Sequence, residues 1–166
     1  MQKTADFTTV FFPTQTDTEA FAARLAQALL SHEDLIASSG FNLRLTGGLG
    51  AGKTTFTRAL LRACGVTGRV RSPTFELVEN YEIGESLAFH HFDFYRFESP
   101  EEFDEAGFRE LFGAGMVTAC EWSDKAAGYL PEADLEITLT VEKLSRQARL
   151  EARSRLGQII LTEVCA

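Results

Sequence analysis

The chain has 166 residues and 45% of them are apolar, which fits one domain with a buried core and excludes a chain that is disordered throughout. Asp and Glu number 24 against 16 Lys and Arg, and this formal charge of −8 argues against a protein that grips nucleic acid by itself. The 3 cysteines form no Cys-x-x-Cys pair and no Cys/His cluster, so neither a disulfide framework nor a zinc site is predicted.

The chain shows no sign of export or membrane insertion. The opening stretch "MQKTADFTTVFFPTQTDTE" has only a short apolar run and soon turns acidic, unlike a signal peptide. No apolar segment approaches the ~20 residues that a membrane-spanning helix needs. We therefore expect a cytoplasmic protein with reduced thiols.

The first third of the chain predicts a strand, a helix, and then a second strand and helix around a glycine-rich turn. A short strand over Thr8 to Phe12 stops at Pro13, and a helix with apolar residues at helical spacing follows, capped by Thr16 or Asp17. "SHEDLIASSG" is a polar connection. "FNLRLTG" alternates as a strand does, and the helix after the turn runs roughly from Lys53 to Cys64.

The remainder predicts more strands than helices. "RSPTFELVENYEIGESLAFHHFDFYRF" has two β-rich runs around the turn signal "IGES", which indicates a hairpin. "SPEEFDEAGFRELFG" is typical of an amphipathic helix with Ser99 as its cap. "GMVTACEWSDKA" is a short buried strand that ends at Glu121, and "DLEITLTVEKL", "QARLEARSR" and "IILTEV" are expected closing strands. Residues 1–166 thus form a single α/β domain, with a mixed parallel and antiparallel β-sheet flanked by helices.

The stretch "LRLTGGLGAGKTTFTRALL" carries the clearest chemical signal. Gly47, Gly52, Lys53 and Thr54 satisfy the phosphate-loop pattern Gly-x-x-x-x-Gly-Lys-Ser/Thr, between a predicted strand and a predicted helix. The glycines let backbone N–H groups turn around phosphate oxygens, and the helix presents its positive end to the same anion. Lys53 is placed to reach the β- and γ-phosphates and the Thr54 hydroxyl to bind Mg²⁺. The predicted nucleotide-binding stretch consists of Gly47, Gly48, Leu49, Gly50, Ala51, Gly52, Lys53, Thr54 and Thr55.

Two acids end apolar strands and are candidates for the magnesium shell and for catalysis. They are Asp93 in "LAFHHFDFY" and Glu121 in "MVTACEW". The bare sequence leaves open that one of them is only a structural cap or an ion-pair partner. His90 and His91 precede Asp93 in a buried strand and fit core or edge histidines better than metal ligands.

Three further features bear on the nucleotide. Thr74, beside Ser72 in "RSPTF", lies where many phosphate-loop enzymes carry a residue that senses the γ-phosphate, although an ordinary turn explains it as well. Trp122, the 1 tryptophan of the chain, either lies beside the base or packs in the core. No Asn-Lys-x-Asp motif occurs, which argues against guanine and makes ATP the expected nucleotide.

Four motifs in series, "LTGGLGAGKTTFTRALL", "RVRSPTFELVENY", "HHFDFYRF" and "CEWSDKA", resemble those of the bacterial TsaE family, also called YjeE. The resemblance runs from about Thr18 to the closing strands. It departs at Gly48, where the family often has an acid, and at "SHEDLIASSG", which is longer than usual and is expected to be a surface loop.

The resemblance implies roles for individual residues. It makes Thr54 and Glu121 the Mg²⁺ ligands and Asp93 the strand carboxylate at the active site. It makes the Ser-Pro-Thr segment around Thr74 a switch on the γ-phosphate side, and it places Trp122 near the nucleotide. It also implies that Thr18 approaches the adenine and that an arginine of the closing strands, here assigned to Arg146, contacts the nucleotide.

The resemblance also implies a function. The family is a partner-dependent ATPase required for the threonylcarbamoyl group at N6 of adenosine 37, in tRNAs that read codons beginning with A. It binds Mg-ATP and acts with the TsaB–TsaD complex, resetting it between turnovers, and meets tRNA only through that complex; TsaC makes the threonylcarbamoyl donor. Slow hydrolysis by the chain alone is expected, with Arg71 and Arg96 as candidates for a catalytic arginine. A small-molecule kinase and a non-hydrolysing nucleotide-gated module are the alternatives.

Overall fold

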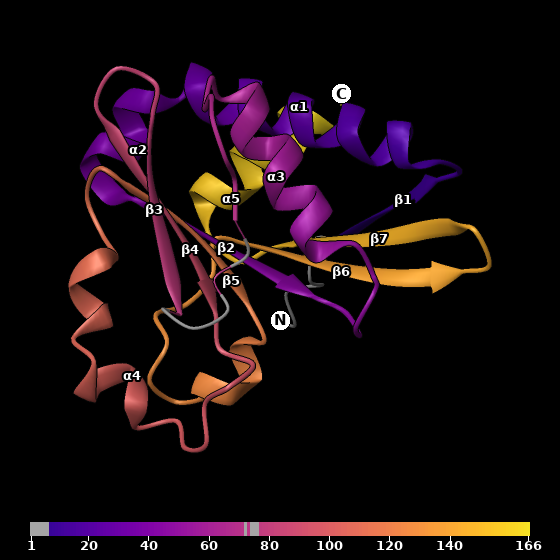
Figure 1. Cartoon of the computed structure of the whole chain (residues 1–166). Helices are drawn as coiled ribbons and strands as arrows, with labels where there is room; N and C mark the ends of the chain where they lie inside the picture. Colours follow the sequence, from indigo (N-terminus) through magenta and orange to yellow (C-terminus); the bar gives the residue numbers. More distant parts are fainter. Residues whose placement is uncertain (1–6, 72, 74–76) are drawn as a thin grey trace, which may run out of the picture.

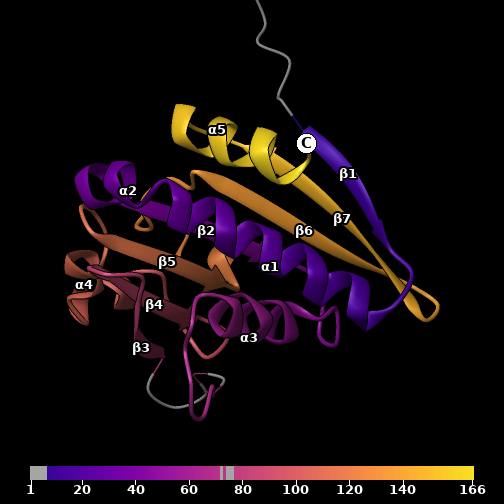
Figure 2. The ribbon, with the colours of Figure 1, turned by 90° about the horizontal axis from the view of Figure 1, so that it is seen from above.

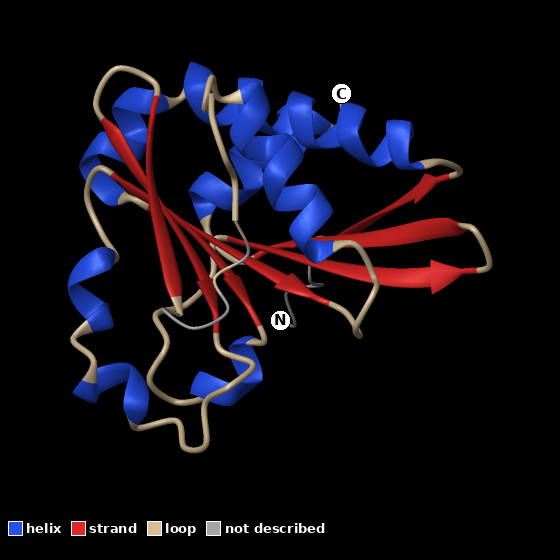
Figure 3. Ribbon diagram, in the orientation of Figure 1, coloured by secondary structure: helices blue, strands red, loops and turns tan. Residues whose placement is uncertain are grey.

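A computed structural model of the chain describes residues 7–71, 73 and 77–166. Figure 1 labels its elements, and Figure 3 shows helices and strands in the same orientation. The strands are β1 (Phe7–Phe12), β2 (Phe41–Thr46), β3 (Val78–Ile83), β4 (Leu87–Asp93), β5 (Met116–Glu121), β6 (Leu135–Glu142) and β7 (Ser145–Ala152). The α-helices are α1 (Gln15–Ser31), α2 (Glu33–Ser39), α3 (Lys53–Ala63), α4 (Glu102–Glu105) and α5 (Arg155–Val164), and the 3₁₀ helices are η1 (Phe108–Leu111) and η2 (Ser123–Ala126).

The strands of this part of the chain form one 7-stranded sheet in the order β1-β7-β6-β2-β5-β4-β3. The four central strands β6, β2, β5 and β4 are parallel, whereas β3 pairs with β4, β7 with β6 and β1 with β7 in antiparallel fashion. The predicted α/β fold with a mixed sheet is therefore confirmed, as is the hairpin around "IGES". Because parallel strands run the same way, the carboxyl ends of β2, β4 and β5 meet at one edge.

Two apolar clusters cover the two faces of the sheet. Helices α1, α2, α3 and α5 bury the larger cluster against one face, as the views in Figures 1 and 2 show together. The smaller cluster, on the opposite face, is built from Phe92, Phe94, Phe97, Phe103, Cys120 and Ala126, with Phe108 and Leu111 of η1 packed against it. Each fully buried phenylalanine contributes about 1.5–3 kcal/mol to stability. Successive residues of β4 and β5 point to opposite faces: Phe89 and Ala119 belong to the larger cluster, and Phe92 and Cys120 belong to the smaller one.

Helix α1 begins earlier than the sequence predicted. Thr14 is its N-cap: the Thr14 hydroxyl accepts from the backbone N–H of Asp17 at 3.3 Å, and the Asp17 carboxylate accepts from the Thr14 N–H at 3.0 Å. This reciprocal capping box needs a threonine followed by an acid three residues later. The prediction of Thr16 or Asp17 as cap was wrong, because both residues lie within the first turn of the helix and Asp17 is the N3 residue of the capping box.

Two segments expected to be non-helical are helices. "IILTEV", predicted as a closing strand, lies in α5, where Ser154 caps the helix and Gly157, Ile160, Leu161 and Val164 are buried on one side. Its β-branched residues favour a strand locally, but burial at helical spacing decides the structure. "SHEDLIASSG", predicted as a connection and surface loop, contains α2, whose Ile36 is fully buried.

The predicted helix over "SPEEFDEAGFRELFG" is broken into two short pieces. Helix α4 spans only Glu102–Glu105, and η1 follows after Gly107, whose φ of 73° ends the helical path. Ser99 does not cap α4; its hydroxyl donates to the Glu101 carboxylate instead. In this segment the burial of Phe103 and the packing of Phe108 override helix propensity. No helix in the described part of the chain is both long and apolar enough to span a bilayer.

Candidate functional site

The carboxyl edge of the sheet brings the predicted loop and both predicted acids together. Strand β2 leads into the loop at residues 47–52, and α3 begins directly after it at Lys53. Strand β4 ends at Asp93 and β5 at Glu121, and these two residues are paired in register. Glu121 is also paired with Leu45 of β2, so its strand lies between the loop strand and the Asp93 strand.

The loop needs glycine at two positions for different reasons. Gly52, the N-cap of α3, has a φ of 104°, a conformation that other residues rarely adopt. A Cβ on Gly47 would lie 2.7 Å from the carbonyl oxygen of Leu139 in β6. The loop can therefore pack closely on β6 and still turn sharply into α3, whose positive end then faces the loop.

Lys53 is enclosed by the loop. Its Nζ donates to the carbonyl oxygen of Gly47 at 2.5 Å and lies 4.0 Å from the centre of the Trp122 ring. The side chain is buried, and this burial lowers the pKa of Lys53, while the carboxylates of Glu121, Asp93 and Asp124 act in the opposite direction. The cation is thus held among loop carbonyls and an aromatic ring, with acids nearby.

The two acids have different surroundings. Burial raises the pKa of Asp93, and Glu121 adds to this, whereas the N–H of Tyr95, His91 and Lys53 oppose it. The Tyr95 N–H donates to Asp93 Oδ1 at 2.9 Å. Glu121 is only 2% exposed, and its Oε2 lies 2.5 Å from Nε2 of His91. Asp93 is the more accessible carboxylate and Glu121 the more rigidly held.

A pocket of about 300 Å³ joins most of the predicted residues. Its described lining is Leu49, Gly50, Ala51, Gly52, Lys53, Thr54, Thr55, Asp93, Glu121, Trp122 and Arg146. We call this the loop pocket. The predicted Arg71 and Arg96 are not among these described lining residues, and the Arg71 N–H donates to the Tyr81 hydroxyl at 3.3 Å.

Arg146 and Thr18, assigned by resemblance alone, meet beside the loop. The Arg146 guanidinium donates from Nε to the carbonyl oxygen of Ala51 at 3.1 Å and from Nη2 to that of Gly50 at 3.3 Å. Thr18, from the first turns of α1, lines a small pocket of about 140 Å³ with Gly52, Thr55 and Arg146. This small pocket lies between the start of α1, the loop and the β6–β7 hairpin.

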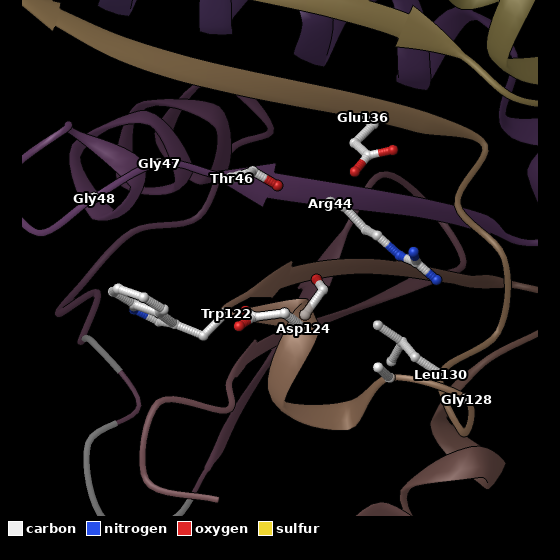
Figure 4. A pocket seen from close by; sticks show the side chains of 11 residues that line it. Arg44, Thr46, Gly47, Gly48, Trp122, Asp124, Gly128, Leu130 and Glu136 are labelled. Atoms are coloured by element: carbon white, nitrogen blue, oxygen red, sulfur yellow. The ribbon is translucent and has the colours of Figure 1, made fainter. Parts of the chain in front are cut away.

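A larger pocket of about 690 Å³ lies on the other side of Trp122. Gly47 and Gly48 line it, together with Arg44, Asp124 and Glu136. Figure 4 shows the Trp122 ring and the Arg44 guanidinium at its two ends, with Asp124 between them. The Arg44 Nη2 donates to the carbonyl oxygen of Pro131 at 2.8 Å. Trp122, whose φ is 56°, thus contributes to both pockets.

The donor set of the loop pocket suits a hard divalent cation. Thr54 contributes a hydroxyl, and Asp93 and Glu121 contribute carboxylates, all oxygen donors of the kind that Mg²⁺ prefers. Mg²⁺ is usually held by one or two carboxylates together with phosphate oxygens and water, not by a full protein cage. Within the described residues, no group of three or more His, Cys, Asp or Glu could hold a metal, and such a site does not require one.

Two predicted positions lie outside the described residues. They are Ser72 and Thr74, the candidates for sensing the γ-phosphate, and their roles stay predictions.

His91 lies at the site although the sequence did not single it out. The sequence predicts a core or edge histidine here, and His91 is indeed buried, but its ring contacts Glu121. The signal was its position two residues before Asp93, because strand alternation places both side chains on one face. His90, on the opposite face, bonds through Nδ1 to Asn80 Oδ1 at 2.7 Å.

Comparisons with known proteins agree on one family. The model of the family described as "Threonylcarbamoyl adenosine biosynthesis protein TsaE" matches residues 12–150. The tRNA threonylcarbamoyladenosine biosynthesis protein TsaE of Haemophilus influenzae is 37% identical over 154 residues, which cover 93% of this chain and 95% of that protein. The Rickettsia felis protein of the same name is 34% identical over 145 residues, covering 87% and 74% of the two chains. The crystal structure of YdiB from Bacillus subtilis superposes with a TM-score of 0.73 at 25% identity, covering 99% of this chain and 97% of the other.

Proposed function

This chain belongs to the TsaE family of threonylcarbamoyl adenosine biosynthesis proteins, and from that premise we propose that it is an ATPase that serves this tRNA modification. It binds Mg-ATP and hydrolyses it to ADP and phosphate. The observation that carries the proposal is the meeting of Lys53, Asp93 and Glu121 at a glycine-rich loop that opens a helix.

In this proposal the phosphate oxygens of ATP replace the loop carbonyls as the hydrogen-bond acceptors of the Lys53 ammonium group. The ammonium group donates to Gly47 O and would be exchanged onto β- and γ-phosphate oxygens, which are stronger acceptors because they carry charge. The N-terminus of α3 adds its positive end to the same anion. Lys53 then neutralises charge that develops during phosphoryl transfer.

Thr54 and Glu121 are the residues that would hold Mg²⁺, and the metal supplies charge neutralisation at the phosphates. Asp93 faces the same pocket, where burial raises its pKa, and in this proposal it is the carboxylate that accepts a proton from the attacking water. Glu121 is held by His91 and is the less suited to that task. Thr18 and Arg146 border the small pocket beside the loop, which suits the adenosine part of the nucleotide.

We further propose that the ATPase works with a TsaB–TsaD complex in the cytoplasm and reaches tRNA only through that complex. The formal charge of −8 supports this, because an acidic protein that acts on a protein partner need not bind tRNA tightly. Coupling to the partner would reset the complex between rounds of threonylcarbamoyl transfer to adenosine 37.

Phosphate release from ATP, measured for this protein alone and with a TsaB–TsaD pair, tests the proposal. We expect slow release alone and strong stimulation by the pair, and loss of both rates in Lys53→Ala. Omitting Mg²⁺ should abolish release in both conditions. An equal rate with and without the pair would contradict coupling, and phosphate transferred to an added metabolite instead of water would indicate a kinase.

A further inference from the structure

A buried histidine lies directly behind the carboxylate of Glu121. His91 and Asp93 are alternate residues of β4, so their side chains leave the same face of the sheet. On the neighbouring strand β5, Glu121 is paired in register with Asp93, so its side chain leaves the same face. The His91 and Glu121 side chains are 1% and 3% exposed. The pair is therefore shut off from water although Glu121 lines the loop pocket.

The contact between the two side chains uses one atom of each. His91 Nε2 lies 2.5 Å from Glu121 Oε2, while the other ring nitrogen, Nδ1, is buried and makes no hydrogen bond in the described structure. Breaking the contact would leave a carboxylate oxygen and a ring nitrogen buried without hydrogen-bond partners, which is unfavourable for both groups. The Glu121 side chain is thus restricted to the rotamer in which Oε2 meets the ring.

We propose that His91 is the positioning residue of Glu121. By holding Oε2, it fixes the carboxylate in the orientation in which Glu121 serves the loop pocket, and it does so without touching nucleotide or metal itself. The inference rests on the proposed function, because that function gives Glu121 its Mg²⁺. Hydrogen bonds that orient a metal ligand from behind typically matter 10- to 100-fold in metal affinity, about the size of effect expected here.

His90 is a matched control for His91. It is the adjacent residue of the same strand, is also buried and also has one ring nitrogen without a hydrogen bond in the described structure. Its side chain leaves the opposite face and bonds to Asn80. Replacing either histidine removes a buried imidazole from β4, but only the replacement of His91 releases Glu121.

The test compares ADP affinity in Mg²⁺ with ADP affinity in EDTA, by calorimetry on the full chain. The ratio of the two is the gain that the metal provides. We expect His91→Leu to reduce this gain about tenfold and His90→Leu to leave it within about twofold. Affinity in EDTA should stay within about twofold in both variants, because the phosphate loop is intact.

A second pair of variants separates positioning from loss of packing. His91→Gln places a carboxamide where Nε2 of the ring lies and should keep most of the gain, whereas His91→Asn has the same chemistry but is too short to reach Glu121 and should lose it. In a Glu121→Ala background, His91→Leu should add less than a further factor of about two, because residues that act through one contact are not additive. The comparison of His91→Gln with His91→Asn still tests the positioning role if His91→Leu folds poorly.

The outcomes distinguish this inference from the function on which it rests. If Glu121→Ala removes the Mg²⁺ gain but His91→Leu and His91→Asn keep it, the positioning role is wrong and the proposed function stands. If Glu121→Ala itself keeps the full gain, the metal role of Glu121 fails and the positioning role fails with it. Equal losses in His91→Leu and His90→Leu would mean that strand packing, not the contact with Glu121, is responsible.

Discussion

At the scale of single residues, Lys53 offers the most direct test of the loop. Lys53→Ala removes the only ammonium among the described residues of the loop pocket, and a charged hydrogen-bond donor is worth about 1.5–3 kcal/mol. We expect the Kd for ATP to rise about 10- to 100-fold and hydrolysis to stop. Isothermal titration calorimetry and phosphate release measure the two effects.

Trp122 gives a second test at the same loop. Because Lys53 Nζ lies 4.0 Å from the Trp122 ring, the fluorescence emission of this single tryptophan should change as ATP is titrated into the wild type. Emission that does not change on proven binding would contradict the position of Trp122.

Glu121 should separate turnover from binding. Glu121→Gln keeps the shape of a buried side chain but removes its charge, so nucleotide affinity in EDTA should change little while turnover falls about 100-fold or more. The control is Glu142→Gln, which changes an exposed carboxylate at the end of β6, a strand separated from β5 by β2. Phosphate release and ADP affinity, measured on the same preparations, decide the matter; unchanged turnover in Glu121→Gln would rule out the proposed role.

Residue patterns went far in indicating this site. The glycine-rich loop, Asp93 and Glu121 were visible in the sequence because each follows or ends an apolar run, and parallel strands bring such ends together. His91 was harder to single out, because alternation places it on the face of Asp93, but its contact with Glu121 follows only once the register of β4 against β5 is known. Arg44 likewise reads as one polar residue in an alternating strand.

At the scale of elements, the β6–β7 hairpin supports the loop through Arg146. Arg146→Ala removes two hydrogen bonds to loop carbonyls, at Ala51 and Gly50. We expect about 1 kcal/mol less stability and about tenfold weaker nucleotide binding, because the loop loses its fixed support. Arg149→Ala is the control, since Arg149 lies on the same strand but its guanidinium stacks 4.3 Å from the Phe7 ring. Equal effects of the two variants would contradict a specific link between hairpin and loop.

Helix α5 depends on a glycine that contacts backbone. A Cβ on Gly157 would lie 1.8 Å from the carbonyl oxygen of Asp134. Because this oxygen is a backbone atom, the clash is relieved only if α5 or the chain around Asp134 moves. Gly157→Ala should therefore destabilise the fold by about 2 kcal/mol or more, although alanine is the better helix former. Urea denaturation with the exposed Thr162→Ala of the same helix as control measures the difference; an equal or higher midpoint for Gly157→Ala would show that the contact relaxes easily.

Elements were harder to predict than residues where burial opposes local preference. The residues of α5 are rich in β-branched side chains, and the sequence alone does not show that Ser154 caps a helix while accepting the N–H of Gly157 at 2.9 Å. Helix α2 is short and mostly polar, and one buried residue, Ile36, is its main tie to the core. Strands β4 and β5 were predictable because nearly every residue is buried, which leaves a continuous apolar run.

At the scale of the whole molecule, the three cysteines report on the integrity of the fold. Cys64 and Cys120 are buried and Cys165 is exposed. Burial raises the pKa of Cys64 to about 11 and that of Cys120 further still, so little thiolate forms at either residue near pH 8. We expect iodoacetamide at pH 8 to label Cys165 at least about 100-fold faster than the other two, and all three at similar rates in denaturant. Peptide mass spectrometry gives the three rates; fast native labelling of Cys120 would mean that the sheet opens.

The enclosure of Lys53 has a consequence for the energy of the whole molecule. Folding strips water from this ammonium group and gives it loop carbonyls and an aromatic ring in return, so the native state carries an electrostatic strain that its own dipoles only partly relieve. A polyanion that binds at the loop meets a cation that folding has already desolvated. The electrostatic attraction between them therefore does not have to offset the desolvation of Lys53. Anion binding and folding are therefore linked. A bound polyanion should stabilise the native state, and it should do so most strongly at the phosphate loop, where the desolvated ammonium group of Lys53 is unfavourable without an anion.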